Sequence, residues 1–512
     1  MSDVLSRSPD DQPPTPCKDG GAPSFGLIVF GASGDLTQRR LIPALYRLFR
    51  GNLLPERFFV LGVSRTQITT DQFRDLLATS IKSATPKEYD EALWRAFATR
   101  ISYEPIDYAF QESYIRLLEV LLPELQRTHG GRERSIFYLA IPPTLYEDVL
   151  LHLGASMGSE KEGDALRIVI EKPFGRDLDS SRRLNRLLHR FFKEDRIFRI
   201  DHYLGLETVQ SLLMFRFANS IFEPLWNRRY IDHVQITVSE SRGIEHRAGY
   251  YEQAGVIRDM FQNHIFQLLA LTAMEPPVAF EAEAVRNERA KVFASIRPFA
   301  LERLAEHVAI GQYGPGRLQG LSVPGYREEP GVRPGSVTPT FAAMKILIDN
   351  WRWNGVPFYL RSGKRLMTRK TEISIHFRPV PHLMFAKALD QPIEPNVLLL
   401  RIQPDEGISL AFQTKKPESK ICLQEVRMDY TYERELLMDA YEWVLLDCIH
   451  GDPMLFLSEA EVERSWALLT PVIERLESTI QPDRFPNYAA GTSGPEEARV
   501  LIEKDGRRWR PL

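Results

Sequence analysis

Short apolar runs alternate with helical patterns over about the first 200 residues. Four runs have the length and composition of buried parallel strands, namely residues 25–30, 58–63, 136–141 and 166–170. Amphipathic stretches lie between them, and one places Leu41, Leu45 and Leu48 on a single helix face. Strands and helices that alternate in this way predict a doubly wound parallel sheet over residues 24–200.

The pattern of apolar and polar residues changes after residue 200. Apolar and polar residues alternate over 233–240, 372–377 and 397–402, which predicts half-exposed strands of an antiparallel sheet. Helical patterns cover 250–274 and 432–450, and the Pro/Gly-rich segment 314–339 is typical of a long surface loop. Residues 201–512 are therefore predicted to form a larger α+β domain. Residues 1–23, rich in Pro, Asp, Ser and Gly, are predicted to be a disordered leader.

Composition narrows the class of protein. The 512 residues carry a formal net charge of −3, so the chain as a whole has no signal for nucleic-acid binding. Its three cysteines, Cys17, Cys422 and Cys448, have neither metal-like nor paired spacing. The apolar runs are too short to span a bilayer, and the first residues have no signal-peptide core. We expect a cytoplasmic protein with no membrane or nucleic-acid partner and no metal.

A glycine-containing turn follows the first predicted strand. It contains Gly31 and Gly34 and reads GASGDL. Glycines there allow a tight turn and a close approach to a pyrophosphate, and the next helix offers free N–H groups to phosphate oxygens. The turn departs from the G-x-G-x-x-G fingerprint, so a purely structural turn is the alternative.

The end of the second predicted strand bears on the choice of cofactor. Dinucleotide-binding domains that use NAD commonly carry an acidic residue there, whereas a basic residue suits the 2′-phosphate of NADP. Here the strand is followed by Arg65, whose guanidinium has the charge and geometry for a phosphate. The alternative is a solvated surface arginine.

Three further segments carry residues suited to catalysis. Lys172 lies in EKPFG, directly after a predicted strand, where ligands of parallel sheets bind. The segment RIDHYLG brings a carboxylate, an imidazole and a phenol together at Asp201, His202 and Tyr203. His264 shares the apolar face of the helix predicted over 255–274, where it is either an ordinary core histidine or a desolvated base. Asp201 is one carboxylate that could orient such a base.

Taken together, these segments resemble the glucose-6-phosphate dehydrogenase family, whose reaction opens the oxidative pentose phosphate route. The shared patterns run in family order from about residue 24 to the end: GASGDL, EKPFG, RIDHYLG, GYYEQAGVIRDMFQNH, VPFYLRSGK, PNVLLLRIQPDEG and GPEEA. The resemblance implies an N-terminal Rossmann-like domain and a larger domain on a mainly antiparallel sheet. It also implies a homodimer or homotetramer, a sugar phosphate substrate and NADP as cofactor.

The resemblance also implies roles for individual residues. His264 would be the general base, Asp201 would orient it, and Lys172 would contact substrate and cofactor next to a proline that is cis in the family. The implied cofactor-binding residues are Gly31, Ser33, Gly34, Asp35, Arg65 and Lys172. The implied substrate-binding residues are Lys172, His202, Tyr203, Glu240, Asp259, Lys364 and Arg369.

One departure concerns the substrate phosphate. A lysine follows DHYLG in the family and helps to hold the phosphate, whereas this chain has Leu206. Ser493 also stands before GPEEA, where close relatives often have an aromatic residue. The sequence therefore leaves open a paralogue with an altered hexose substrate, or a weakly active regulatory subunit. Arg216 and Arg242 are candidates to replace the missing charge.

Overall fold

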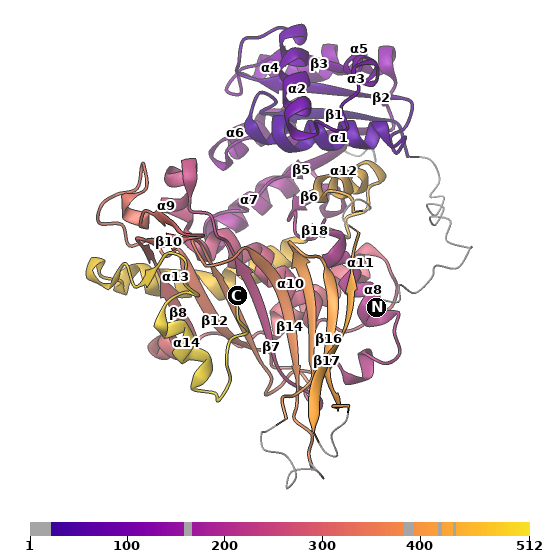
Figure 1. Cartoon of the computed structure of the whole chain (residues 1–512). Coiled ribbons are helices and arrows are strands. Elements are labelled where there is room, and N and C mark those ends of the chain that lie inside the picture. Colours follow the sequence, from indigo (N-terminus) through magenta and orange to yellow (C-terminus); the bar gives the residue numbers. More distant parts are fainter. Residues whose placement is uncertain (1–21, 158–165, 383, 385–392, 418–421, 434–436) are drawn as a thin grey trace. The chain divides into compact units, whose positions relative to one another are not determined.

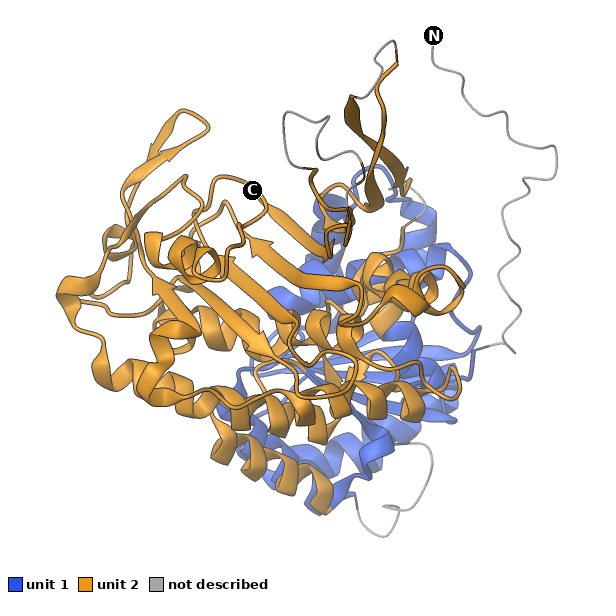
Figure 2. Cartoon of the chain, turned by 90° about the horizontal axis from the view of Figure 1, so that it is seen from below, with its two compact units in different colours: residues 1–170, 191–198, 445–452 blue, residues 171–190, 199–444, 453–512 orange. Residues whose placement is uncertain are grey.

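The chain divides into two compact units that interleave along the sequence. A computed structural model describes residues 22–157, 166–382, 384, 393–417, 422–433 and 437–512 (Figure 1), so the predicted leader lies outside the described residues except for its last two. Unit 1 contains residues 1–170, 191–198 and 445–452, and unit 2 contains 171–190, 199–444 and 453–512 (Figure 2). The predicted domain boundary after residue 200 stays a prediction, although 171–190 and 199–200 group with unit 2.

Unit 1 is built on a parallel sheet, as its apolar runs predict. Its strands lie in the order β5-β4-β1-β2-β3, with bounds β1 (Phe25–Phe30), β2 (Phe58–Ser64), β3 (Ile101–Pro105), β4 (Arg134–Leu139) and β5 (Leu166–Ile170). Every residue of β1 and β2 is buried, which explains their unbroken apolar character. The sequence analysis missed β3, because this edge strand reads ISYEP and buries only two of its residues.

Helices separate the strands of unit 1 and complete a Rossmann-like α/β fold. Local signals explain where some begin: Thr69 and Gln72 form a capping box at α2, and Asp90 caps α3. The helical elements are η1 (Thr37–Leu41), α1 (Ile42–Arg50), α2 (Thr70–Ala84), α3 (Glu91–Ala98), α4 (Gln111–Arg116), η2 (Leu117–Leu121), α5 (Leu122–His129), η3 (Pro143–Leu145), α6 (Tyr146–Ser156) and η5 (Glu194–Arg196).

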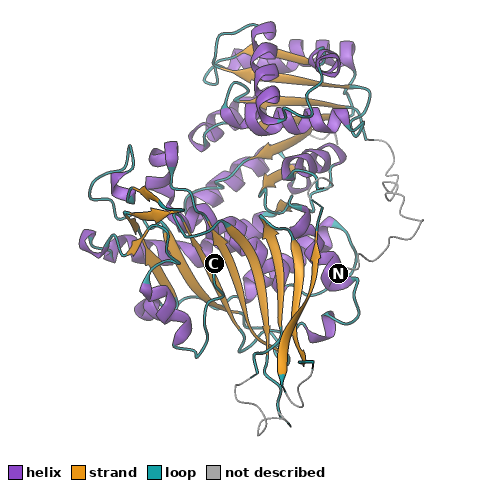
Figure 3. Cartoon of the chain, viewed as in Figure 1, coloured by secondary structure: helices purple, strands orange, loops and turns teal. Residues whose placement is uncertain are grey.

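Unit 2 is built on an eight-stranded sheet in the order β17-β16-β15-β14-β7-β13-β12-β8 (Figure 3). All neighbouring pairs are antiparallel except β7 and β13. The strands are β7 (Ile231–Ser239), β8 (Val308–Gly311), β12 (Phe341–Leu347), β13 (Pro357–Gly363), β14 (Lys370–Phe377), β15 (Val397–Gln403), β16 (Gly407–Lys415) and β17 (Leu423–Thr431). The predicted fold class, α/β followed by a larger mainly antiparallel α+β part, is confirmed.

Helices and short elements complete unit 2, and α10 lies behind its sheet in the view of Figure 1. The helices are α7 (Leu178–Phe191), α8 (Glu207–Phe217), η6 (Glu223–Leu225), η7 (Glu245–Arg247), α9 (Ala248–Val256), η8 (Ile257–Ile265), α10 (Phe266–Ala273), α11 (Ala282–Ser295), η9 (Leu301–Glu306), η10 (Tyr326–Glu328), α12 (Ala440–His450), α13 (Glu459–Thr479), η13 (Pro482–Arg484) and α14 (Glu496–Glu503). The short strands are β6 (Ile197–Ile200), β9 (Tyr313–Gly314), β10 (Gly316–Leu318), β11 (Leu321–Val323), β18 (Phe456–Leu457) and β19 (Tyr488–Ala489). Of these elements, β6, α7 and α12 cross the unit boundaries.

Two predictions for this region were wrong, and a third, the helix over 250–274, was right except for one break. The helix over 250–274 is interrupted at Gly255, whose φ of 58° lies in the left-handed region that glycine tolerates. The segment predicted as a loop over 314–339 contains the β10–β11 hairpin and η10. The helix predicted from 432 begins at Ala440, since β17 continues to Thr431.

The strand β7 is buried except at the partly exposed Asp232, rather than half exposed along its length. Its polar side chains are covered by the last residues of the chain: Gln235 donates a hydrogen bond to the carbonyl of Arg508 at 2.9 Å. Neighbouring Arg361 on β13 likewise donates to the carbonyl of Arg510 at 2.5 Å. The alternation of apolar and polar residues in this strand therefore arises from a polar face that is itself buried. No helix among the described residues has both the length and the apolar character needed to cross a bilayer.

Candidate active site

The glycine turn of unit 1 has the geometry that a dinucleotide phosphate requires. Gly31 has a φ of 82°, and a Cβ atom there would lie 2.2 Å from the carbonyl oxygen of Ala140, so only glycine fits. Its N–H donates to the carbonyl oxygen of Val63 and to the hydroxyl of Tyr108, both at 2.9 Å. Helical structure begins at Asp35 and aims its first N–H groups toward the turn. The turn therefore fits the predicted cofactor.

The end of β2 lies against the same turn. The hydroxyl of Ser33 is 2.9 Å from that of Ser64 and 2.8 Å from that of Thr66. Arg65 stands between these two residues and is exposed. Asp35 is also exposed and pairs with Arg39 at 2.5 Å. A phosphate held by Arg65 would thus lie beside this turn.

A buried histidine–carboxylate pair forms the centre of the candidate active site in unit 2. The Nδ1 atom of His264, from η8, is hydrogen-bonded to Oδ1 of Asp201, which directly follows β6. The same Asp201 oxygen accepts the N–H of Tyr203 at 3.0 Å. The other oxygen, Oδ2, is buried and has no hydrogen-bond partner among the described residues. This arrangement orients the imidazole and leaves carboxylate charge to stabilise it once protonated.

Lys172 faces the other nitrogen of this imidazole. Its Nζ lies 2.7 Å from Nε2 of His264 and 3.2 Å from the carbonyl oxygen of Asp259. The bond between Lys172 and Pro173 is cis, as the resemblance implies. Because an ammonium group can only donate, Nε2 of His264 is the acceptor and the proton of a neutral ring lies on Nδ1. The geometry presents Nε2 as a base next to a positive charge.

Burial and charge together shift the pKa of both members of the pair. Burial lowers the pKa of His264 and Lys172 lowers it further, which outweighs the raising effect of Asp201. Burial raises the pKa of Asp201, but the charge and hydrogen bond of His264 hold it below its ordinary value. At neutral pH the pair is therefore a carboxylate beside a neutral imidazole, the state that a general base requires.

Aromatic rings pack around the base. The ring of Tyr203 stacks on His264 with a centroid distance of 4.2 Å, and His202 meets His264 edge-on at 4.6 Å. Tyr441 lies parallel to His202 at 6.3 Å, and its hydroxyl donates to Glu171 at 3.4 Å. Sequence reasoning missed Tyr441, because it lies on α12, 270 residues from its partner Glu171. We find no local signal that would have identified it.

A second group of charges lies beside Lys172. Asp259 is buried, with its carboxylate 3.6 Å from Lys172 and 3.9 Å from Lys364. Burial raises the pKa of Asp259, but the two lysines outweigh it and hold the pKa at about 2. Lys364 also pairs with Glu240 at 2.5 Å. The hydroxyl of Tyr250, a residue of the GYYEQAG motif that the prediction left out, donates to Asp259 at 3.3 Å.

The structure thus brings most of the predicted substrate residues of unit 2 into one cluster. Arg369 is exposed and bonded to Gln403 at 3.1 Å, although it lies near enough to lower the pKa of the Tyr203 hydroxyl. Burial, the largest influence, raises the pKa of that hydroxyl well above its ordinary value. Leu206 precedes α8 as its N-cap and donates its N–H to the carbonyl of Tyr203 at 3.1 Å.

Of the two arginines suggested as a replacement for the missing lysine, Arg216 already has other partners. Arg216 is fully buried, donates to the carbonyls of Leu271 and Met274 at 2.8 Å each, and so holds the C-terminal end of α10. Arg242 is 85% exposed and lies 4.0 Å from the carboxylate of Glu245, so its part in compensation stays a prediction. Compensation by Arg216 is therefore wrong.

Asp201, His202 and His264 offer ligand atoms within 4.8 Å of one another, close enough to hold a metal ion. The ammonium of Lys172, 2.7 Å from Nε2 of His264, opposes a second positive charge there. The absence of a metal stays a prediction.

Comparison with known protein families identifies the relatives of this arrangement. Residues 28–211 match the model of the glucose-6-phosphate dehydrogenase NAD binding domain, and residues 213–510 match that of its C-terminal domain. The chain belongs to the glucose-6-phosphate dehydrogenase family. The resemblance predicted from the motifs is thereby confirmed.

Individual relatives cover nearly the whole chain. It is 44% identical over 495 residues to a glucose-6-phosphate 1-dehydrogenase of Chlamydia pneumoniae, covering 95% of this chain and 96% of the relative. It is 45% identical over 488 residues to that of Aggregatibacter actinomycetemcomitans, covering 94% and 97%.

Two solved structures are also similar over nearly the whole chain. A glucose-6-phosphate dehydrogenase in complex with glucose 6-phosphate has a TM-score of 0.86 at 34% identity, covering 96% of this chain and all of the other. The enzyme of Mycobacterium avium has a TM-score of 0.80 at 35% identity, covering 96% and 99%.

Proposed function

We propose that this protein oxidises glucose 6-phosphate at carbon 1 to 6-phosphogluconolactone and transfers the hydride to NADP. The observation that carries the proposal is the buried His264–Asp201 pair with Lys172 at Nε2, in a chain whose similar solved structures include a complex with glucose 6-phosphate. We further propose a cytoplasmic homodimer or homotetramer that acts in the pentose phosphate pathway.

His264 would act as the general base. Its Nε2 atom is the acceptor, and a substrate 1-hydroxyl that replaced Lys172 as the donor would lie within hydrogen-bond reach. The proton moves from that hydroxyl to Nε2, and the imidazolium that forms is stabilised by Asp201. Lys172, displaced by about one hydrogen-bond length, stays beside the oxygen at carbon 1 and orients it.

The phosphate of the substrate would be bound by His202 and Tyr203, with Lys364, Glu240 and Asp259 contacting sugar hydroxyls. These residues offer both donors and acceptors, as the hydroxyls of a hexose require. A bound nicotinamide supplies the acceptor for the hydride. In unit 1, Gly31, Ser33, Gly34 and Asp35 would hold the pyrophosphate and Arg65 the 2′-phosphate.

Arg65→Ala is expected to raise the Michaelis constant for NADP by about 10- to 150-fold. Its charge-assisted bonds to the 2′-phosphate contribute on the order of 1.5–3 kcal/mol, which converts to that range. Initial rates with NADP and with NAD test the assignment, and the constant for NAD should change little. Arg95→Ala, at an exposed arginine of the same unit, is the control. Equal losses with both cofactors would contradict the assignment to the 2′-phosphate.

Leu206→Lys tests whether the missing charge weakens phosphate binding. A charge-assisted contact contributes about 1.5–3 kcal/mol, so the natural enzyme should have a high Michaelis constant and the variant one about 10- to 150-fold lower. Leu206→Met, which adds no charge, is the matched control. If the Michaelis constants of Leu206→Lys and Leu206→Met lay within about twofold of each other, residue 206 would point away from the phosphate.

Two alternatives are less well supported than a glucose-6-phosphate dehydrogenase. They are a paralogue with an altered hexose substrate and a weakly active regulatory subunit. The most direct test measures initial rates of the purified protein with glucose 6-phosphate, glucose and other hexose phosphates, each with NADP and NAD. Glucose 6-phosphate with NADP should give the highest kcat/KM. A higher value with an unphosphorylated hexose would support the altered substrate, and no turnover with any pair would support the regulatory subunit.

A further inference from the structure

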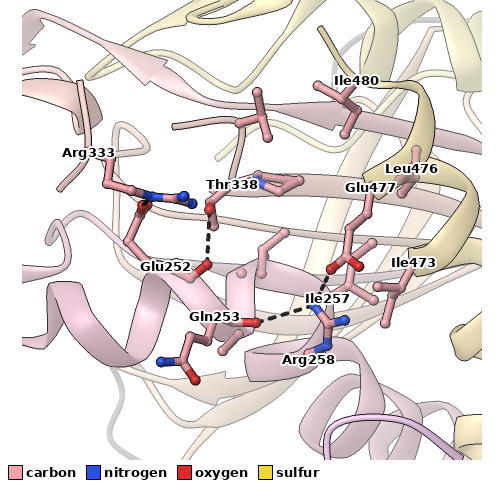
Figure 4. Close-up of a pocket in the computed structure, with 15 residues that line it drawn as sticks. Glu252, Gln253, Ile257, Arg258, Arg333, Thr338, Ile473, Leu476, Glu477 and Ile480 are labelled. Carbon is pink, nitrogen blue, oxygen red and sulfur yellow. Dashed lines mark hydrogen bonds and ion pairs between the residues drawn. The ribbon is translucent and has the colours of Figure 1, made fainter. Parts of the chain in front are cut away.

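A cavity of about 200 Å³ lies in unit 2 against the first residues of η8, the helix that carries the base (Figure 4). Its apolar wall consists of buried side chains from two separate helices, with Ile257 on η8 and Ile473 and Leu476 on α13. Val337 and Pro339 also line the cavity. An apolar cavity of about 150 Å³ accommodates benzene, so this one has room for one aromatic ring and a small polar group.

Two ion pairs stand at the polar edges of this cavity. On one side Arg333 donates to Glu252 at 2.9 Å, and Glu252 also accepts from the hydroxyls of Tyr326 and Ser336 at 2.6 Å each. On the other side Glu477 reaches from α13 toward Arg258 and accepts from its Nη1 at 2.7 Å (Figure 4). Glu252 is therefore held in place by three donors.

The ion pair of Arg258 and Glu477 can be broken more easily than that of Arg333 and Glu252. The Arg258 side chain is only 15% exposed, whereas that of Glu477 is 57% exposed. A carboxylate so exposed can turn to solvent at little cost, since ion pairs of this kind contribute little to stability. Its departure would leave the half-buried guanidinium facing the cavity, where a carboxylate of a bound molecule could take the same position.

Arg258 also connects the cavity to both segments of the candidate active site. Its Nε donates to the carbonyl of Arg176 at 3.0 Å, four residues after Lys172, and its backbone directly precedes Asp259. Lys172 makes a second hydrogen bond between the same two segments, to the carbonyl of Asp259 at 3.2 Å. The segment around Lys172 and the helix carrying His264 are thus joined twice, once by the catalytic lysine and once by Arg258.

We propose that this cavity is an effector site for a small organic monocarboxylate with an apolar body. The ring or branched chain of the ligand would fill the space lined by Ile257, Ile473 and Leu476, and its carboxylate would replace that of Glu477 on Arg258. Because a bound ligand, unlike Glu477, is not anchored to α13, the Arg258 guanidinium that pairs with it shifts relative to the carbonyl of Arg176. The relative position of Lys172 and His264 changes with it, so occupancy lowers turnover without blocking the substrate.

Binding is tested with 4-fluorobenzoate and the full-length protein by ¹⁹F NMR titration. We expect saturable binding with a Kd on the order of 1 mM, as befits so small a ligand. Glu477→Ala removes the competing carboxylate and should tighten binding about three- to fivefold. Glu474→Ala, an exposed acidic residue of the same helix outside the cavity, is the matched control and should change nothing. Equal affinities in wild type and Glu477→Ala would overturn the proposal.

Filling the cavity gives the opposite test. Val337→Trp, at a half-buried position of its wall, should weaken binding at least tenfold. Thermal unfolding checks that this variant folds, and Ile480→Trp repeats the test from the α13 side if it does not. Unchanged affinity in a folded, filled variant would overturn the proposal.

Kinetics decide whether the site is coupled to catalysis. With glucose 6-phosphate and NADP, 4-fluorobenzoate should act as a partial inhibitor, non-competitive with either substrate, and half-maximal at the Kd found by NMR. Competitive inhibition, or none at full occupancy, would overturn the effector role. The NMR titrations measure binding without turnover, so their result is valid even if the proposed function is wrong.

Discussion

His264→Asn is expected to lower kcat by about 10²- to 10⁴-fold, the usual contribution of a general base. The amide preserves approximate size and one polar contact to Asp201, so the variant should fold, but it cannot accept the proton of the 1-hydroxyl. Steady-state kinetics should show the loss in kcat, with the Michaelis constant for glucose 6-phosphate changed far less. Near-normal turnover would mean that His264 is only a buried core histidine.

The matched control for this variant is His233→Asn. His233 is also buried in unit 2 and is also bonded through Nδ1 to a carboxylate, that of Asp232, at 2.8 Å, but it is not among the residues proposed for the reaction. Its loss should leave kcat within about twofold of wild type. Asp201→Asn should cost less than His264→Asn, because the carboxylate only orients the ring and stabilises its charged form.

Lys172→Gln is expected to lower kcat/KM by about 10- to 150-fold and to move the acid limb of its pH profile to higher pH. The loss of rate reflects one charge-assisted contact of about 1.5–3 kcal/mol. The shift of the limb follows from the pKa of His264, which burial lowers most, Asp201 raises and Lys172 lowers. Removing the lysine charge therefore raises the pKa of the base.

The acid limb of the pH profile must move in one direction only, to higher pH. The base must be neutral to act, so activity falls as the pH drops through the pKa of His264, which in the wild type lies below the ordinary histidine value. Lys345→Gln is the matched control, because Lys345 is exposed to the same extent, 20% against 21%, and pairs with Asp505 at 2.7 Å. A limb that stayed in place in Lys172→Gln, or moved to lower pH, would exclude a direct electrostatic contact.

The buried sheet of unit 1 was predictable from local pattern. Strands such as β1 and β2 are covered on both faces, and so their sequences are continuous apolar runs bounded by turns. The family motifs were equally local, and they pointed to His264, Asp201 and Lys172 before any contact between them was known. What these signals share is that each is contained in a short stretch of the chain.

Other features depend on contacts between distant segments. The break at Gly255 is stabilised by the N–H of Val256, which donates to the carbonyl of Pro339 at 3.0 Å, and the burial of Gln235 requires the C-terminal residues. The contacting residues lie outside the helix and the strand concerned. The break at Gly255 and the burial of Gln235 were therefore not predicted.

The sequence by itself determined the family, the parallel sheet and the residue types available for acid–base chemistry. Only the tertiary structure decided that Asp201 is hydrogen-bonded to His264 across 63 residues, that Lys172 faces Nε2, and that Tyr441 stacks on His202. It also decided that Arg216 is occupied at the end of α10. The physical reason is that hydrophobic periodicity and turn chemistry act over a few residues, whereas the pairing of buried polar groups is set by how whole elements pack.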